Sequence, residues 1–177
     1  STRKESSAAS DVYKRQEIVK SNVIWDDTSS VVSETRVPEL DLTEVHPLDD
    51  LMKVNVLDPY SAILRLLNHI ERTGNCTSSY EVYDGRRRSR IYFEKIGKIV
   101  LEQDRPGVFT GSAMVCRVKF EPIGGHRINS KWRSNKGQKE WVKVFFARPL
   151  QGQIMPVRIE VNSWVGKIIA SLDLRQM

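Results

Sequence analysis

The sequence predicts a mainly β protein, built from a curved antiparallel sheet or partial barrel with one packed α-helix. From Tyr80 onward, apolar and polar residues alternate with a period of two in one segment after another. Such alternation is typical of strands in an antiparallel sheet that has one packed and one solvated face. Short glycine-containing connections separate the segments and favour strands that pair in sequence order. Only one segment has helical periodicity instead.

The predicted helix covers residues 58–74. Asp58 is a good N-cap, Pro59 suits the first helical position, and Gly74 suits the left-handed position that ends a helix. The spacing of the apolar residues predicts that one face packs on the sheet. That face consists of Tyr60, Ile63, Leu64, Leu67 and Ile70.

The strand segments follow the helix and begin at Tyr80. Asp84-Gly85 is a strong signal for a hairpin turn, because glycine tolerates a positive φ. Gly97 is expected to separate two strands, over residues 86–96 and 98–102. Further strands are predicted over residues 116–121, 141–146, 157–161 and 167–174.

The N-terminal part of the chain divides into two segments. Residues 1–16 are polar and aperiodic, which predicts a disordered tail. Because Asp11 to Gln16 resembles the translated end of a transposon used in sequencing, we interpret this tail as a sequencing or cloning artefact; a natural tail is the alternative. Residues 17–57 contain a predicted hairpin and an extended connector, which leaves residues 58–177 for the helix and the β domain.

Composition narrows the classes of function. The chain has 177 residues, of which 40% are hydrophobic and 28% charged, and these ordinary values exclude wholesale disorder. The formal net charge is +6, or +4 without residues 1–16, and so small a surplus does not by itself indicate nucleic-acid binding. No run approaches the ~20 apolar residues of a membrane-spanning helix. Nucleotide-binding, hydrolase and metalloprotease motifs are absent, and the histidines and cysteines are scattered. We therefore predict no enzymatic activity, no cofactor and no metal site.

The two cysteines, Cys76 and Cys116, are 40 residues apart. Cys76 follows the helix and Cys116 opens a strand, so a disulfide would fasten the end of the helix to the sheet. An even number of cysteines without a metal-binding motif favours this disulfide, which requires Cα atoms within about 7 Å. The alternative is two unrelated thiols in a reducing cytosol.

Four longer stretches are distinctive, namely LDPYSA from Leu57, VYDGRRR from Val82, CRVKFEPIGGH from Cys116 and PVRIE from Pro156. In residue type, order and spacing they resemble a bacterial envelope family catalogued as a domain of unknown function, DUF3108. The resemblance runs from Leu57 to the C-terminus.

The resemblance implies an exported periplasmic protein with an antiparallel β architecture similar to the half-barrel carriers of lipoprotein transport. No catalytic residues are established for the family, so it supplies none here. Its members usually have a further block of strands before the helix, and residues 17–37 are the one segment that can be its remnant. This departure predicts an N-terminally truncated fragment whose signal peptide is missing.

Two groups of residues are candidate binding sites. Arg86, Arg87 and Arg88 follow the hairpin turn and form a candidate anion site; the alternative is an edge strand protected by charge. Alternation places Arg87 on the same face as Ile91 and Phe93. The second group is the apolar concave face of the sheet, which is either an open groove or a closed core. Its predicted lining is Phe93, Val118, Phe120, Val144, Phe146, Ile159 and Leu172.

These observations predict a non-catalytic periplasmic envelope protein with a binding or structural role, whose partner is an apolar, lipid-like ligand or a protein segment. The alternative, from a different class, is a cytosolic basic module that binds nucleic acid. A basic loop around Trp132, over residues 129–139, is the feature that favours it. A single aromatic residue is weak support for such an interface, so nucleic acid is not the expected partner.

Overall fold

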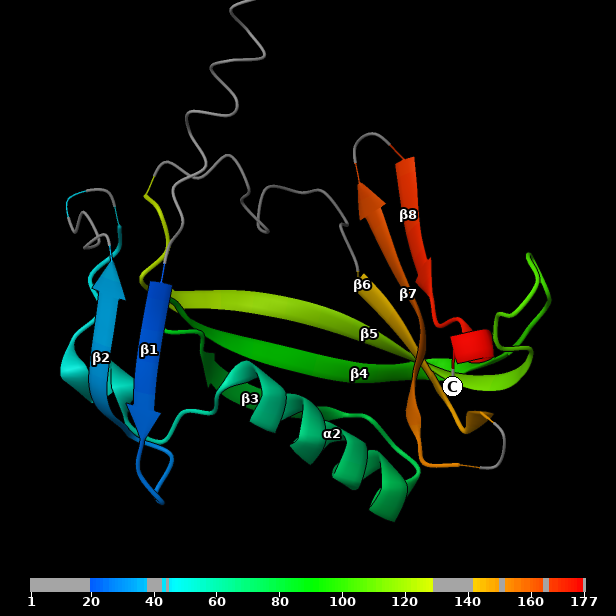
Figure 1. Ribbon diagram of the computed structural model, residues 1–177, viewed down its shortest axis with the longest axis horizontal. Helices are drawn as coiled ribbons and strands as arrows, with labels where there is room; N and C mark the ends of the chain where they lie inside the picture. The colour runs from blue at the N-terminus through cyan, green and yellow to red at the C-terminus, as the bar shows by residue number, and fades with distance from the viewer. Residues whose placement is uncertain are drawn as a thin grey trace, which may run out of the picture.

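The alternating segments of the sequence form strands that pair in sequence order. The computed structural model describes residues 20–37, 43, 45–128, 142–149, 152–163 and 166–176. Six strands form one antiparallel sheet in the order β3-β4-β5-β6-β7-β8, and β1 and β2 form a separate two-stranded sheet (Figure 1). The mainly β fold with one α-helix is thus confirmed, and the larger sheet is not closed into a barrel.

The elements have the following bounds. The small sheet consists of β1 (Lys20–Trp25) and β2 (Val31–Val37). The large sheet consists of β3 (Ser78–Tyr83), β4 (Arg88–Leu101), β5 (Gly111–Gly124), β6 (Val142–Ala147), β7 (Met155–Ser163) and β8 (Gly166–Ser171). The helical elements are the helix α2 (Pro59–Thr73) and the short 3-10 turns η2 (Asp50–Lys53) and η4 (Leu174–Gln176).

Helix α2 begins and ends at the predicted residues. The carboxylate of Asp58 accepts hydrogen bonds from two backbone N–H groups of the first turn, at 2.9 and 3.0 Å. These bonds satisfy donors that have no partner within the helix. Gly74 ends the helix with a φ of 65°, a left-handed conformation that glycine adopts without strain.

The buried face of α2 differs from the predicted one. Its buried residues are Ala62, Leu66 and Ile70, whereas Tyr60, Ile63 and Leu64 are exposed. Apolar residues occupy more of the helix circumference than the sheet covers. Periodicity alone therefore did not identify which of them contact the sheet. Of the predicted residues, Ile70 is buried and Leu67 packs partly buried against the core.

The large sheet packs on both faces, not on one face as predicted. On the helix side, the core contains Leu66, Ile70, both cysteines and Phe146. On the opposite side, Phe145 is buried in a second cluster, although alternation assigned it to the wet face. The members of the second cluster are Leu101, Ala113, Val115, Phe145, Ala147 and Val157, with Phe109, Met155 and Leu172 packed against them.

The second cluster is covered by the C-terminal residues, which fold back over the face of the sheet opposite the helix. Leu174 donates a backbone hydrogen bond to the Gly107 carbonyl at 2.7 Å, which fastens the C-terminal residues to the connection between β4 and β5. A bridge between Val108 and Asp173 adds to this contact. The strands β4 and β5 are long and twisted, as Figure 1 shows, so their far ends need a cover of their own.

Gly97 lies within a strand and does not separate two of them. β4 runs through it without a break, and the register with β5 shifts between Lys95 and Gly97. Gly97 has a φ of 149°, which a β-bulge accommodates well when the residue is glycine. The two strands predicted over residues 86–96 and 98–102 are therefore one strand with a bulge.

The two sheets meet at Tyr83. Its side chain is almost fully buried, its ring contacts Trp25 edge-on at 6.2 Å, and its hydroxyl donates a hydrogen bond to Glu34 at 2.5 Å. Lys53 binds the other oxygen of Glu34 at 2.7 Å. The hairpin predicted in residues 17–37 is therefore present as β1 and β2, and it is attached to the main sheet through these contacts.

Candidate binding surfaces

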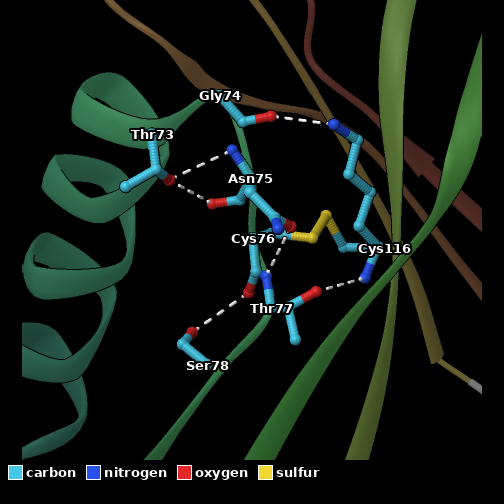
Figure 2. The surroundings of a disulfide bond; sticks show 8 residues. Thr73, Gly74, Asn75, Cys76, Thr77, Ser78 and Cys116 are labelled. Atoms are coloured by element: carbon cyan, nitrogen blue, oxygen red, sulfur yellow. Dashed lines mark hydrogen bonds between the residues drawn. A yellow bond between two sulfur atoms is a disulfide. The ribbon is translucent and has the colours of Figure 1, made fainter.

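The disulfide predicted between Cys76 and Cys116 is present, with a Cα–Cα distance of 6.4 Å. Figure 2 shows it joining the segment after α2 to the middle of β5. Both cysteines are fully buried in the core on the helix side of the sheet. A Lys95 ammonium donates to the Gly74 carbonyl at 2.9 Å and closes the helix end over the bond. Disulfides persist in oxidising compartments, so this bond suggests such an environment.

The predicted lining of the apolar face divides into three groups. Phe146 and Val118 are buried, and Phe93 and Val144 pack partly buried against the core on the helix side. Leu172 lies in the cluster on the opposite side of the sheet, because the chain leaves β8 before reaching it. Phe120 and Ile159 are 37% and 38% exposed. The face is therefore closed under the helix and open beyond it.

The open part consists of two cross-strand rows of aliphatic residues. Directly opposed residues of neighbouring strands lie on the same face. One row continues from buried Val118 and the other from buried Cys116, and both cross β6, β7 and β8. We call these continuations the apolar shelf, which consists of Val142, Val144, Ile159, Val161, Ile168 and Ala170.

Exposure of the apolar shelf increases with distance from the helix. Val118 is 4% exposed, Val142 and Val161 are half-buried, and Ile168 at the end of that row is 56% exposed. Sequence reasoning named Val144 and Ile159 but missed the others. Their alternation was visible in the sequence, whereas the position at which the helix stops covering them was not.

The three arginines predicted as an anion site do not act together. Arg87 lies in the turn before β4, so the alternation that placed it on the face of Ile91 does not apply to it. Its Nε and one terminal nitrogen both donate to Oδ2 of Asp84, at 2.9 and 2.7 Å. Arg88 is bound to Glu81. Of the three, only Arg86 has no carboxylate partner among the described residues, and its buried Nε atom donates no hydrogen bond there either. The alternative of a charged edge strand is also wrong, because β4 lies between β3 and β5.

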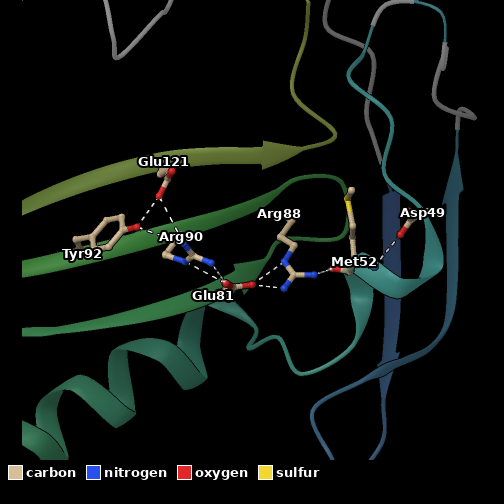
Figure 3. Close-up of polar contacts among 7 residues, drawn as sticks. All are labelled: Asp49, Met52, Glu81, Arg88, Arg90, Tyr92 and Glu121. Atoms are coloured by element: carbon tan, nitrogen blue, oxygen red, sulfur yellow. Dashed lines mark hydrogen bonds and ion pairs between the residues drawn. The ribbon is translucent and has the colours of Figure 1, made fainter.

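Glu81 on β3 receives two arginines of β4, as Figure 3 shows. Arg88 and Arg90 each approach it through two nitrogen atoms, with Nε distances of 2.8 and 3.0 Å. Burial alone would raise the pKa of Glu81, but the hydrogen bonds from Arg90 and Arg88 outweigh burial and hold the pKa below its ordinary value. Arg88 also donates to the Met52 carbonyl at 2.5 Å and so joins the sheet to η2.

The Glu81 pair predicts a specific pH dependence. A carboxyl whose folded-state pKa is lowered adds stability above its ordinary pKa of about 4.3, and this stability is lost as the pH falls through the folded value. Glu81→Gln should therefore lower the free energy of unfolding by ~2 kcal/mol at pH 7, because charge-assisted hydrogen bonds are lost. The difference from the unaltered protein should shrink at pH 3, measured by urea denaturation at both pH values.

Glu94 on β4 provides the matched control, because it lies on the same face of the sheet as Glu81 and its side chain is 61% exposed. Its contact with Arg117 is longer, at 3.4 Å. Glu94→Gln should change the stability by less than ~0.5 kcal/mol. A Glu81→Gln penalty that is the same at pH 3 and pH 7 would contradict the assigned role of the carboxylate.

A cleft of about 290 Å³ lies between the tip of the β1–β2 hairpin and the start of α2. Its carboxylates are engaged by local backbone: Asp26 accepts from Thr28 and Ser30, and Asp58 caps the helix. The rest of its lining is mixed, with Trp25, Leu57 and Leu64 beside the polar side chains of Ser61 and Arg65.

Within the described ranges, no helix is long and apolar enough to cross a membrane. The same residues contain no group of three or more histidine, cysteine or acidic side chains placed to hold a metal ion. The predicted basic loop around Trp132 lies outside the described residues, as does the predicted tail over residues 1–16.

Comparison with known proteins identifies the family of the chain. No curated protein and no solved structure matches the chain. The model of the family described as "Protein of unknown function (DUF3108)" matches residues 12–173. The match therefore starts 45 residues before Leu57, where the resemblance in the sequence was first evident. It includes the small sheet, the helix and the whole of the large sheet, and the chain belongs to the DUF3108 family.

Proposed function

We propose that this protein is a non-catalytic binding protein of the bacterial periplasm, which holds an apolar, lipid-like ligand or an apolar protein segment on its apolar shelf. The observation that carries the proposal is the continuation of two core rows into solvent across β6, β7 and β8. Contiguous exposed aliphatic residues on a protein surface are typical of interaction sites.

The two faces of β7 and β8 differ in a way that supports this proposal. On the face opposite the apolar shelf, Glu160 binds Arg158 at 2.9 Å and Lys167 at 2.6 Å. Arg158 also lies over the Phe145 ring, 5.8 Å from its centroid. The charged side chains of this face thus form ion pairs within the chain, and Ile169 is exposed among them. On the apolar shelf, the exposed residues form two continuous aliphatic rows instead.

The chemistry of the apolar shelf favours binding over catalysis. All six side chains are aliphatic, so they offer no nucleophile and no acid or base to a bound molecule. Their contribution to binding is the burial of apolar area, which suits an acyl chain or an apolar peptide side chain.

The disulfide and the family support the proposed compartment. A fully buried bond that closes a 40-residue separation suits an oxidising environment, and the resemblance to envelope proteins points to the periplasm. The cytosolic nucleic-acid alternative depended on free thiols, so the disulfide weighs against it.

A neutral solvatochromic dye should bind the native chain, and Ile159→Asp should weaken this binding about tenfold or more. Burial of one isoleucine side chain is worth ~1.5–3 kcal/mol, and a carboxylate removes that gain. Because Ile159 is 38% exposed, the variant is expected to keep the native circular dichroism spectrum. Dye fluorescence titrations measure the effect.

Two further variants separate the apolar shelf from other apolar surfaces. Val32→Asp places the same charge on the small sheet, at a residue 66% exposed, and should leave dye binding unchanged. Leu64→Asp does the same on the exposed side of α2. The proposal fails if the native chain binds no dye, if Val32→Asp weakens binding equally, or if Leu64→Asp alone abolishes it.

A further inference from the structure

Three arginines from separate parts of the chain gather where the small sheet meets the end of the β4–β5 ribbon. They are Arg36 on β2, Arg86 in the turn between β3 and β4, and Arg127 just after β5. We call them the arginine cluster. This grouping is independent of the apolar shelf and includes only one of the three residues that the sequence indicated.

Backbone contacts fix the positions of two members. A Cβ built on Gly125, which has a φ of 72°, would lie 1.9 Å from the Arg86 carbonyl oxygen, so the turn rests directly on the end of β5. Only glycine fits at such an approach. Arg127 follows two residues later and is held by a bridge to Val45. Arg86 and Arg127 are therefore carried by rigid, contacting backbone.

The charges of Arg36 and Arg127 both act unfavourably on Arg86. Burial lowers the pKa of Arg86, and the charges of Arg36 and Arg127, with that of Arg87, lower it further. The Nε atoms of Arg36 and Arg86 are both buried and have no hydrogen-bond partner. A buried donor without a partner is unfavourable, and like charges at close range add to that cost.

The nearest described carboxylates are already engaged. Asp84 uses one oxygen for backbone N–H groups of the turn and the other for the Arg87 guanidinium. Glu34 binds Lys53 with one oxygen and accepts the Tyr83 hydroxyl with the other. Asp84 partly offsets the charge of Arg86 through space, but both oxygens of each carboxylate are already bound to other groups.

We propose that the arginine cluster is an anion site for a phosphate group, whether free phosphate or the phosphate of a lipid headgroup. Guanidinium groups bind phosphate oxygens in pairs of hydrogen bonds, and a tetrahedral anion offers enough acceptors for several of them. The site would satisfy the unpaired donors of Arg36 and Arg86 and cancel the repulsion among the three charges.

The first test measures inorganic phosphate binding to the full chain by isothermal titration calorimetry. Arg86→Gln should weaken binding about 10- to 100-fold, because hydrogen bonds to charged groups are worth ~1.5–3 kcal/mol. Arg87→Gln is the matched control, because Arg87 is adjacent to Arg86 in the sequence but is already paired with Asp84. This variant should change the phosphate affinity less than about twofold. The proposal is overturned if the two variants lose affinity equally. It is also overturned if the native chain binds neither inorganic phosphate nor phosphatidylglycerol vesicles.

A second arm identifies the source of the phosphate. Cosedimentation with phosphatidylglycerol vesicles, compared with phosphatidylcholine vesicles, shows whether the chain binds an anionic headgroup. Binding to the former that Arg86→Gln abolishes assigns the site to a lipid, and binding of inorganic phosphate alone assigns it to a free anion. Binding to phosphatidylglycerol that Arg86→Gln leaves intact contradicts the proposal.

The thermal stability of Arg86→Gln without phosphate tests whether the role of Arg86 is purely structural. Removing one of three repelling charges should leave the thermal midpoint of Arg86→Gln equal to or above the native one in phosphate-free buffer. A lower midpoint would show that Arg86 has a structural partner within the chain. Glu39, Asp41 and Glu44 follow Arg36 in the sequence and lie outside the described residues. If phosphate binds only after all three are replaced by Gln, Asn and Gln, the chain supplies its own counter-charges and the proposal is wrong.

Discussion

Replacing both Cys76 and Cys116 with alanine should lower the free energy of unfolding by ~4 kcal/mol. The bond closes a separation of 40 residues, and the chain-entropy treatment of such a loop gives a stabilisation of this size. Because both side chains are fully buried, the substitution also removes contacts in the core under the helix. Urea denaturation at pH 7 measures the difference.

Reduction of the native chain supplies the control for this prediction. A reducing agent should destabilise the native protein by a similar amount and should leave the double alanine variant unchanged. If the native protein is equally stable with and without the reducing agent, the bond contributes nothing and the support it lends to an oxidising compartment is lost.

Leu66→Ala should lower the free energy of unfolding by ~3 kcal/mol, whereas Leu64→Ala should change it by less than ~0.5 kcal/mol. Leu66 is 2% exposed and packs in the core on the helix side of the sheet, so its truncation leaves a cavity. Leu64 is 66% exposed on the same helix and loses little when truncated. Urea denaturation of the two variants side by side gives the comparison.

The two variants can be compared directly, because both replace a leucine of α2 with alanine and so change the helical propensity equally. Sequence periodicity assigned Leu64 to the buried face and did not include Leu66, so the two assignments predict opposite orders of stability. A larger loss for Leu64→Ala would restore the face predicted from the sequence and contradict the packing of α2.

Local chemistry explains why some elements could be predicted from the sequence. Asp58, Pro59 and Gly74 fixed the helix ends, because capping depends on residues that are adjacent in the chain. Asp84-Gly85 likewise fixed its turn, in which Gly85 has a φ of 82°. The strand order was predicted from short glycine-containing connections, because consecutive strands usually lie side by side. The order is as predicted, although Gly97 lies within β4 and residues 125–141 separate β5 from β6.

Contacts between distant segments explain the failures. Phe145 was assigned to solvent because its partner surface comes from Phe109 and Leu172, which no local pattern connects to it. Gly97 indicated a break because a glycine in an alternating segment fits either a turn or a bulge. Which of the two it forms depends on β5, its partner strand.

The candidate binding residues divide in the same way. Arg86 was identified because it stands in a dense charge run, and its neighbours were grouped with it for that reason alone. The structure separates Arg87 and Arg88 from it by pairing each with a carboxylate. Arg36 and Arg127 reach it from 50 residues before and 41 residues after in the sequence, a proximity that only the fold creates.

The strictly sequential pairing of the large sheet also determines the order in which the structure can assemble. Every strand from β4 to β8 pairs with the one before it, so a chain synthesised from its N-terminus can add each strand to one that has already formed. Both cysteines and the helix precede residue 125, so the bond can close before β6 has been delivered. The apolar shelf belongs to β6, β7 and β8, so it can form after the disulfide has joined the helix end to β5.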